Sequence, residues 1–339
     1  MMNNQSPISN NRLNWGIIST AHINRRLIPQ LKISARSNLL AVASRSAETA
    51  RAYAAEWDIP QAFGSYEALL ASPEIDVVYI SLPHSMHAEW TVKAAAAGKH
   101  ILCEKPFALT VADVDRMTAA ARVNGVQLME AFMYRTTPLM AKLQSLIADG
   151  LIGRVKLVRA KFSFILKDEK NIRLQKELGG GSLWDVGVYP VSFAQAIAGS
   201  APAEVMAWQQ VNQNGVEVVL TGQMRYPNGM LAQIDSGFAL PFRIGAEIVG
   251  DAGVLYLPVP WFPGLDGRDS VIIHISPDDT ETRIEVEPKD PYLCEIEAME
   301  AAIFDSAPLP VTPEESRNHV RTIVALYESA ETGKVIQLA

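Results

Sequence analysis

LNWGIISTAHIN, residues 13–24, begins as a short apolar run and passes through small residues into a helix-like segment. A buried strand, a turn of small residues and a helix form the first unit of a mononucleotide-binding fold, in which the turn and the helix N-terminus receive a phosphate. Glycines usually occupy that turn, but this chain has Ser19, Ala21 and Asn24 there. We expect Ser19 to adopt the turn geometry without glycine's freedom. Taken alone, the stretch is equally compatible with an ordinary strand–helix turn.

The same alternation continues to about residue 125. Further strand-like runs cover residues 38–44, 77–82, 100–104 and 126–130, and helical patterns cover 23–34, 46–57, 66–70, 88–97 and 111–123. Runs that are apolar on both faces and separated by helices predict a parallel sheet covered on both sides. We therefore expect an α/β, doubly wound domain over residues 13–130, preceded by a polar, flexible leader at residues 1–12.

After about residue 150 the helices give way to successive strands. Strand-like runs cover residues 153–166, 205–212, 217–226, 230–238, 243–250, 253–257, 270–276 and 282–287. Asn228-Gly229 is a strong hairpin signal, and helical patterns at residues 292–306 and 313–330 close the chain. This order predicts an α+β second domain, residues 131–339, with a large, mostly antiparallel sheet. One face of that sheet must be covered by helices or by another subunit.

Composition narrows the class of protein. The 339 residues carry 30 Lys and Arg against 37 Asp and Glu, a net charge of −7, which argues against a generic nucleic-acid or anionic-membrane binder. We find no signal-type segment and no apolar run of the roughly 18 residues that span a membrane. Cys103 and Cys294 are far apart, so we expect no disulfide framework, and we see no metal-site cluster. A cytoplasmic protein without a metal fits this composition.

The end of the second strand bears on the choice of dinucleotide. NAD-binding folds usually place an acid there to hold the ribose 2′-hydroxyl. This chain has Ser44 and Arg45 instead. Because a guanidinium beside a hydroxyl suits a 2′-phosphate, we expect NADP(H) to be preferred, with NAD(H) as the alternative. Arg45 could equally be an exposed residue that starts a helix.

Two further motifs carry candidate chemistry. Lys105, in Glu104-Lys105-Pro106, follows a central strand, at the edge where such sheets bind ligands. Gly179-Gly180-Gly181 runs into a helical pattern in which Asp185 and Tyr189, four residues apart, share one face. A Tyr hydroxyl, with an ordinary pKa of about 10, needs a nearby cation to exchange protons near neutrality, and Lys105 could supply it. The alternatives are a surface lysine, a helix N-terminal acid and a core tyrosine.

These motifs together resemble the glucose–fructose oxidoreductase/inositol dehydrogenase (Gfo/Idh/MocA) family. Residues 15–19, Met129-Glu130-Ala131 and residues 185–189 are similar in particular to the dimeric dihydrodiol dehydrogenase and D-xylose dehydrogenase branch. The resemblance covers nearly the whole chain from residue 13 onward. It implies an N-terminal Rossmann domain for NADP(H) and a C-terminal open sheet through which the chain forms a homodimer or homotetramer.

The resemblance also implies site residues. The cofactor-binding residues would be Ser19, Thr20, Ala21, His22, Ile23, Ser44, Arg45, Leu82, Pro83, His87, Glu104 and Lys105. The substrate-binding residues would be Lys105, Arg135, Trp184, Asp185 and Tyr189. His87 could instead be a helix-capping or internally bonded histidine, and Arg135 a structural ion-pair residue.

The implied reaction is hydride transfer between the nicotinamide and a CH–OH/C=O carbon of a sugar, a polyol or a related carbonyl or diol. Tyr189 would donate and accept the proton, Lys105 would orient the reacting oxygen, and Asp185 would bond substrate hydroxyls or hold Lys105. The degenerate phosphate turn motivates a rival, a catalytically silent NADP(H)-binding sensor or scaffold. A purely structural oligomer is the third interpretation.

Overall fold

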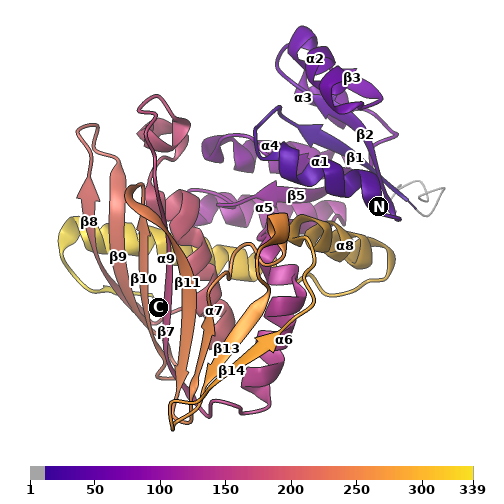
Figure 1. Ribbon diagram of the computed structural model, residues 1–339. Helices are drawn as coiled ribbons and strands as arrows, with labels where there is room; N and C mark the ends of the chain where they lie inside the picture. The colour runs from indigo at the N-terminus through magenta and orange to yellow at the C-terminus, as the bar shows by residue number, and fades with distance from the viewer. Residues whose placement is uncertain (1–11, 339) are drawn as a thin grey trace. The chain divides into compact units, whose positions relative to one another are not determined.

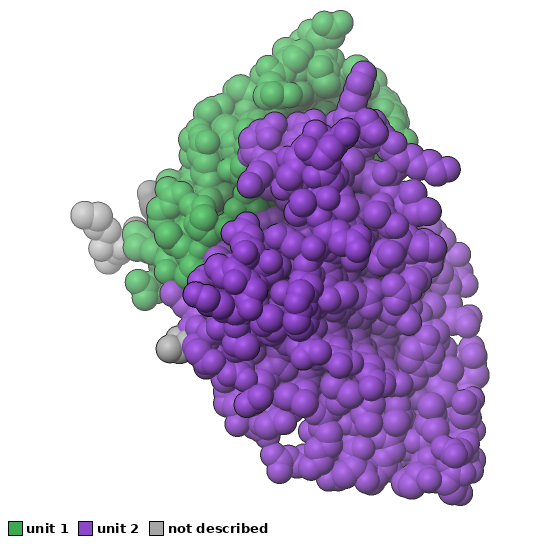
Figure 2. Space-filling view, turned by 90° about the vertical axis from the view of Figure 1, so that its left-hand side faces the viewer, with its two compact units in different colours: residues 1–132, 292–316 green, residues 133–291, 317–339 purple. Residues whose placement is uncertain are grey.

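The computed structural model describes residues 12–338, which fall into the two compact units coloured in Figure 2. The first unit contains the described residues up to 132 together with 292–316, and the second contains 133–291 together with 317–338. The expected leader, residues 1–12, lies outside the described residues except for Arg12. The sequence analysis assigns all residues from 131 onward to the second domain. In the structure, residues 292–316 group with the first unit instead.

The first unit is built on a six-stranded sheet. Its strands are β1 (Leu13–Ile18), β2 (Ser37–Ala43), β3 (Gln61–Phe63), β4 (Val77–Ile80), β5 (His100–Glu104) and β6 (Leu128–Ala131), in the order β3-β2-β1-β4-β5-β6 (Figure 1). Every neighbouring pair is parallel. The doubly wound parallel sheet is confirmed, and the apolar runs are its buried strands. The short edge strand β3 has no counterpart in the sequence pattern.

Five helices connect these strands, α8 joins the unit from late in the chain, and three of the helices begin at a side-chain cap. The helices are α1 (Asn24–Ile33), α2 (Ala47–Trp57), α3 (Tyr66–Leu70), α4 (His87–Ala96), α5 (Val111–Asn124) and α8 (Pro291–Phe304). Ser46, Ser65 and Thr110 each accept a hydrogen bond from a main-chain N–H three residues later, which satisfies one of the unpaired donors of a helix start. Gly125, at φ 64°, ends α5.

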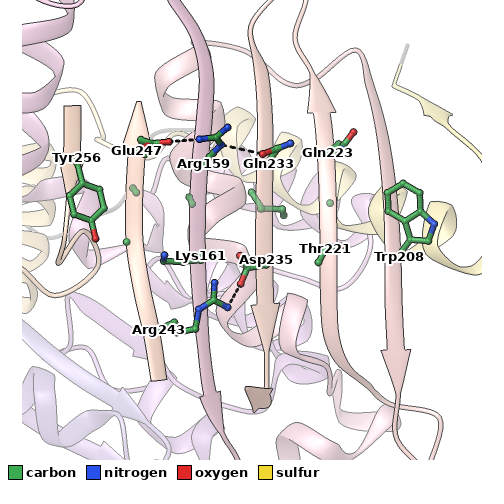
Figure 3. A pocket seen from close by; sticks show the side chains of 15 residues that line it. Arg159, Lys161, Trp208, Thr221, Gln223, Gln233, Asp235, Arg243, Glu247 and Tyr256 are labelled. Carbon is green, nitrogen blue, oxygen red and sulfur yellow. Dashed lines mark hydrogen bonds and ion pairs between the residues drawn. The ribbon is translucent and has the colours of Figure 1, made fainter. Parts of the chain in front are cut away.

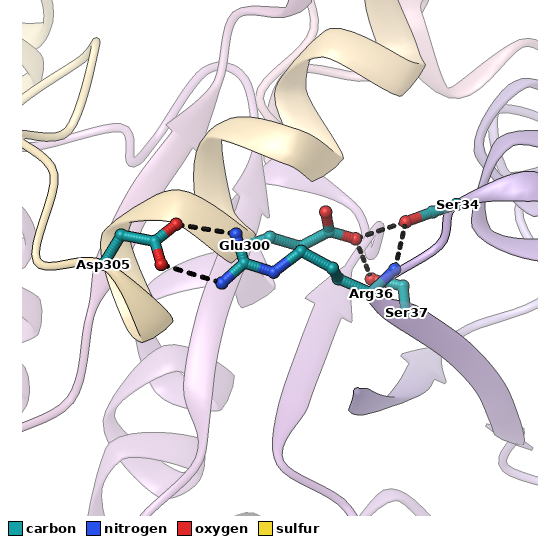
Figure 4. A network of polar contacts seen from close by, with 5 residues as sticks. All are labelled: Ser34, Arg36, Ser37, Glu300 and Asp305. Carbon is teal, nitrogen blue, oxygen red and sulfur yellow. Dashed lines mark hydrogen bonds and ion pairs between the residues drawn. The ribbon is translucent and has the colours of Figure 1, made fainter. Parts of the chain in front are cut away.

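Helix α8 is bonded to the strand β2 region through a buried carboxylate (Figure 4). Glu300 accepts hydrogen bonds from the hydroxyls of Ser34 and Ser37, and Ser37 in turn accepts one from the Trp15 indole N–H at 2.8 Å. Beside it, the Arg36 guanidinium makes a two-pronged pair with Asp305 at 2.6 and 3.0 Å. These contacts explain why residues so late in the chain belong to the first unit.

The second unit contains a nine-stranded sheet in the order β14-β13-β12-β11-β7-β10-β9-β8-β15 (Figure 1). The strands are β7 (Val155–Ile165), β8 (Glu204–Val211), β9 (Glu217–Arg225), β10 (Leu231–Gly237), β11 (Ala239–Gly250), β12 (Val254–Leu257), β13 (Val271–Ile275), β14 (Glu281–Glu285) and β15 (Ile336–Gln337). All pairs are antiparallel except β7 with β10. The large, mostly antiparallel sheet is confirmed, and so is the hairpin at Asn228-Gly229.

Helical segments of the second unit pack on one face of this sheet. They are η2 (Met133–Thr136), α6 (Pro138–Ala148), the π-helical turn η5 (Leu183–Gly187), α7 (Val188–Ala198) and the later part of α9 (Pro313–Thr332). The sequence pattern does not predict α6. On β7, Val158, Ala160 and Phe162 are buried, whereas Arg159 between them is exposed on the opposite face. No helix within residues 12–338 is long and apolar enough to cross a membrane.

Candidate active site

The turn after β1 is held by side-chain hydrogen bonds instead of glycines. Ser19 has φ 132°, a conformation that favours glycine and costs another residue about 1–3 kcal/mol. Its hydroxyl contacts the Ser81 main-chain oxygen at 3.0 Å and accepts the Ala21 N–H at 3.1 Å. Asn24 donates to the Ser19 main-chain oxygen at 3.0 Å and accepts the Ser81 hydroxyl at 2.6 Å. These bonds offset the backbone cost and fix the turn.

Main-chain amides at this turn remain available to a ligand. Asn24, Arg25 and Arg26 donate their N–H groups to main-chain oxygens three residues earlier. The amides of His22 and Ile23 donate to no other group within residues 12–338. Unpaired amides at the start of α1, reinforced by the helix dipole, fit a phosphate group. Thr20 and Ala21 complete the turn and are partly exposed.

The end of β2 places a cation at the same edge of the sheet. Ser44 is buried and its N–H donates to the Phe63 main-chain oxygen at 3.1 Å. Arg45 is exposed and directly precedes Ser46, the cap of α2. No carboxylate of the described chain forms an ion pair with Arg45. The planar set of N–H donors on its guanidinium therefore fits a 2′-phosphate. Arg45 also lies at the start of a helix, which agrees with the alternative interpretation.

His87 links the ends of β4 and β5. It is fully buried, and its ring nitrogens lie 2.9 Å from the Pro106 main-chain oxygen and 2.8 Å from that of Leu82. Burial lowers the pKa of His87, and the two carbonyls offset part of that effect. Its imidazole therefore positions the loops that carry Leu82, Pro83 and Pro106.

Glu104 and Lys105 lie at the carboxyl end of β5, at the same edge of the sheet. Glu104 is buried, accepting the Tyr79 hydroxyl at 2.5 Å and the Lys105 main-chain N–H at 3.2 Å. Burial, with the adjacent Glu104 carboxylate, raises the pKa of Tyr79 well above its ordinary value. The Lys105–Pro106 peptide is cis, and Phe107 after it donates its N–H to Glu130 at 2.9 Å. Glu104 thus fixes the main chain from which the Lys105 side chain extends.

In the second unit, the helix that carries Asp185 and Tyr189 begins with a π-turn. Pro190 has no N–H to donate to the Val186 oxygen, and its ring would clash with that oxygen in a regular α-helix. A Cβ at Gly187 would lie 2.7 Å from Leu183 Cδ1 and 3.0 Å from Ser236 Oγ, so glycine permits the close approach to β10. The η5 turn over Leu183–Gly187 accommodates both residues. Such turns are frequent at functional sites.

A buried carboxylate that the sequence analysis missed anchors the start of this helix. Glu217 on β9 accepts the Ser182 hydroxyl at 2.6 Å, the Leu183 N–H at 2.8 Å and the Tyr327 hydroxyl at 3.1 Å. Burial raises the pKa of Glu217, and these donors oppose the shift. A Cβ at Gly181, whose φ is 128°, would lie 2.4 Å from the Tyr327 hydroxyl. Because Gly181 has no Cβ, the start of the helix can approach Tyr327 and Glu217 closely.

Asp185 forms an ion pair with Arg173, another residue that the sequence analysis missed. The Arg173 Nε donates to the Asp185 Oδ2 at 2.6 Å. Trp184, next in the chain, is largely buried, and its ring lies 5.8 Å from that of Tyr327 between centroids. Trp184 therefore packs into the unit, whereas the Asp185 side chain makes an ion pair.

Tyr189 lies within an aromatic cluster of the second unit. Its side chain is 5% exposed. Ring centroids of four neighbours lie between 5.5 and 6.4 Å from its own, those of Tyr134, Phe162, Trp261 and Phe262. Its hydroxyl lies 3.7 Å from the Met133 sulfur. Such a shell excludes water and strengthens electrostatic effects on that hydroxyl.

Arg135 lies on η2 and reaches the same helix. Its Nη1 lies 3.5 Å from the Ser192 hydroxyl, which also accepts the Tyr134 hydroxyl at 3.0 Å. The second unit therefore brings Arg135, Trp184, Asp185 and Tyr189 together around η5 and α7. The predicted cofactor residues gather in the first unit, at the carboxyl ends of β1, β2, β4 and β5. Within residues 12–338, no group of three or more His, Cys, Asp or Glu side chains is placed to hold a metal ion.

Sequence and structure comparisons place this chain among known proteins. Residues 13–132 match the "Oxidoreductase family, NAD-binding Rossmann fold", and residues 140–256 match the "GFO/IDH/MocA C-terminal domain". D-xylose 1-dehydrogenase (NADP(+)) 2 of Haloferax volcanii is 37% identical over 96% of this chain and 99% of its own. Trans-1,2-dihydrobenzene-1,2-diol dehydrogenase of Xenopus tropicalis is 34% identical over 74% of this chain and 76% of its own.

Two solved structures share both units. Aldose-aldose oxidoreductase from Caulobacter crescentus has a TM-score of 0.88 at 26% identity and covers 96% of this chain and 100% of its own. KijD10, a 3-ketoreductase from Actinomadura kijaniata solved with NADP and TDP-benzene, has a TM-score of 0.87 at 28% identity, over 94% of this chain and 98% of its own. The resemblance drawn from the motifs is confirmed. The chain belongs to the Gfo/Idh/MocA family of oxidoreductases, with an NAD(P)-binding Rossmann domain.

Proposed function

We propose that this chain is an NADP(H)-dependent oxidoreductase acting on a CH–OH/C=O carbon of a sugar, a polyol or a related carbonyl or diol. The observation that carries the proposal is the Tyr189 hydroxyl, set in an aromatic shell four residues after the ion-paired Asp185. Relatives named as a D-xylose dehydrogenase and a dihydrobenzenediol dehydrogenase support this class of substrate. The NADP named with the first of them, and with KijD10, supports the cofactor.

The chain's own residues divide the work. When bound, the nicotinamide supplies or accepts the hydride. The Tyr189 hydroxyl donates its proton to the oxygen that becomes an alkoxide in reduction, and takes a proton back in oxidation. The Lys105 ammonium stabilises negative charge on that oxygen and on the tyrosinate. Ser19, the His22 and Ile23 amides, Ser44 and Arg45 would hold the dinucleotide's phosphates.

A panel of neutral aldoses, keto-sugars and aromatic carbonyls, followed by the absorbance of NADPH at 340 nm, tests this function. We expect turnover of at least one panel member. A second candidate, the silent sensor or scaffold, is motivated by Ser19 and Ala21 in the phosphate turn. NADPH binding, measured by quenching of tryptophan fluorescence, without turnover of any panel member would favour the sensor, and no binding would favour a purely structural protein.

We also propose that the exposed face of the nine-stranded sheet binds a second copy of the chain, giving a homodimer or homotetramer. This face carries a shallow hollow of about 480 Å³ with side chains of both signs (Figure 3). Arg159 pairs with Glu247 at 3.0 Å and Arg243 with Asp235 at 2.9 Å, and Trp208, on β8 at the far side of the hollow, is 56% exposed. A face of mixed charge can pair with its own copy about a two-fold axis, acids against bases. The cytoplasmic location stays a prediction.

A further inference from the structure

We propose that Asn24 and Ser81 are positioning residues for the dinucleotide, because their side chains hold Ser19 in a backbone conformation that glycine usually supplies. The phosphate turn is then ready for NADP(H) before the cofactor arrives. The inference rests on the cofactor part of the proposed function and adds two residues to it. The motifs identify Asn24 only as a residue at a usual glycine position, and they do not single out Ser81.

Ser19 and Ser81 lie on the two sides of the point where the strand order reverses. Ser19 follows β1 and Ser81 follows β4, and these strands are neighbours in the order β3-β2-β1-β4-β5-β6. The carboxyl ends of two such strands flank the crevice in which these sheets bind dinucleotides. The two hydroxyl oxygens are 2.8 Å apart, and both residues are buried. The contact therefore joins the two sides of the expected pyrophosphate site.

Asn24 bonds both sides of that contact with one side-chain amide. Its Nδ2 donates to the Ser19 main-chain oxygen at 3.0 Å, and its Oδ1 accepts the Ser81 hydroxyl at 2.6 Å. Asn24 has no exposed surface, so neither bond competes with bulk water. Because a side-chain amide has a donor and an acceptor in one plane, Asn24 satisfies both partners at once.

Ser19 needs this support because of its backbone conformation. At a φ of 132°, a residue other than glycine is strained. Without support, Ser19 would populate other conformations, and the amides that follow it would change direction. The Ser19 hydroxyl accepts the Ala21 N–H at 3.1 Å, while Asn24 holds the Ser19 main-chain oxygen. Side-chain bonds thus fix both the residue itself and the peptide that follows it.

The direction of this turn determines how the start of α1 meets a phosphate. The amides of His22 and Ile23, which donate to no other group within residues 12–338, bind a phosphate only while the turn keeps its direction. If only a fraction of the molecules has that direction, the measured Kd for the cofactor rises by the inverse of that fraction. Loss of the Asn24 side chain should therefore weaken NADPH binding, although that side chain is itself buried.

Asn24 has another neighbour, whose contribution the test must separate. The Tyr53 hydroxyl faces its side chain; burial raises the pKa of Tyr53, and Asn24 opposes that shift. Replacing Asn24 therefore changes more than its bond to Ser19. Because glycine adopts the conformation of Ser19 without strain, the effect of Asn24→Ala in a chain that carries Ser19→Gly lacks the part that acts through Ser19.

The test is a double-mutant cycle on the Kd for NADPH, measured with the full chain by isothermal titration calorimetry. Asn24→Ala should raise this Kd about tenfold in the unaltered chain, and no more than about twofold in a chain that already carries Ser19→Gly. Ser19→Gly alone is the reference for the second comparison. The control is Asn38→Ala, which removes an amide bond of 2.9 Å to Asn14 near the amino ends of β1 and β2, and it should leave the Kd within about twofold.

Ser81→Ala repeats the comparison from the other partner of Asn24, and it decides the matter if Asn24→Ala does not fold. It should raise the Kd about fivefold in the unaltered chain and no more than about twofold together with Ser19→Gly. A Kd that stays within twofold in Asn24→Ala would overturn the inference. An equal rise with and without Ser19→Gly would also overturn it, because Asn24 would then have a general structural role.

The inference and the proposed function fail in different ways. A chain that shows this pattern of Kd values but turns over no panel member would support the inference and overturn the proposed function. An unaltered chain that binds no NADPH would overturn both.

Discussion

Replacing Ser37 by Ala measures how firmly α8 is held in the first unit. The Ser37 hydroxyl donates to Glu300 at 2.5 Å and accepts from the Trp15 indole at 2.8 Å, and all three side chains are buried. Its removal leaves one buried N–H without an acceptor, about 1–3 kcal/mol, and removes a bond to a charged group, about 1.5–3 kcal/mol. Because such losses are not additive, we expect unfolding of the first unit to become easier by about 3 kcal/mol.

Differential scanning calorimetry and urea titration measure this loss. For a unit of roughly 150 residues, about 3 kcal/mol corresponds to a Tm lowered by roughly 6–12 °C. Ser34→Ala is the comparison, because Ser34 also donates to Glu300 but accepts only a longer, partly buried bond from the Arg36 N–H at 3.3 Å, and it should cost less. A Ser37→Ala protein that melts within 1 °C of the unaltered chain, or no more easily than Ser34→Ala, would refute the reasoning.

Three further predictions concern pH, cofactor and assembly. Burial lowers the pKa of His100 to about 4. As the pH falls below about 6.5, the unfolded chain therefore binds a proton at His100 before the folded chain does. Because this favours the unfolded state, the first unit should lose roughly 3 kcal/mol of stability by pH 4. Urea titrations between pH 6.5 and pH 4 measure how the free energy of unfolding depends on pH, and this dependence should be weaker in His100→Gln. An equal dependence in the variant would argue against the role of His100. Arg45→Asp should lower the kcat/KM ratio of NADPH over NADH at least tenfold, since it sets a carboxylate against the 2′-phosphate, and an unchanged ratio would remove Arg45 from that role. Trp208→Glu should convert the assembly to monomers in analytical ultracentrifugation because it buries a charge in the interface, and an intact oligomer would place the interface elsewhere.

Local patterns were enough to predict most of the first unit's sheet. β1, β2, β4 and β5 begin and end within two residues of the apolar runs, because strands buried on both faces leave a continuous apolar signal. The predicted strain at Ser19 is confirmed by its φ of 132°. What the turn motif could not reveal is the Ser81 and Asn24 contacts that make the strain tolerable.

Long-range contacts explain most of what the sequence analysis missed. Glu300 meets Ser37 across 263 residues, and no local pattern reports that α8 joins the first unit. Arg173 reaches Asp185 through an irregular loop, so helical spacing could not pair them. The regular spacing also hid the π-turn over Leu183–Gly187, which precedes Pro190. Motifs located the candidate site, whereas tertiary contacts determine how its side chains are held.

The most direct test of the central claim is deuterium transfer from NADPH labelled at C4 to a carbonyl substrate, in the unaltered chain and in Tyr189→Phe. We predict deuterium at the reduced carbon, and a rate in Tyr189→Phe lower by roughly 10²–10⁴-fold. The Kd for NADPH should stay within twofold, because the substitution keeps the ring that packs against Phe162 and Trp261 and removes only the hydroxyl. A reduced product without deuterium at that carbon, or a Tyr189→Phe protein as fast as the unaltered chain, would contradict the proposal.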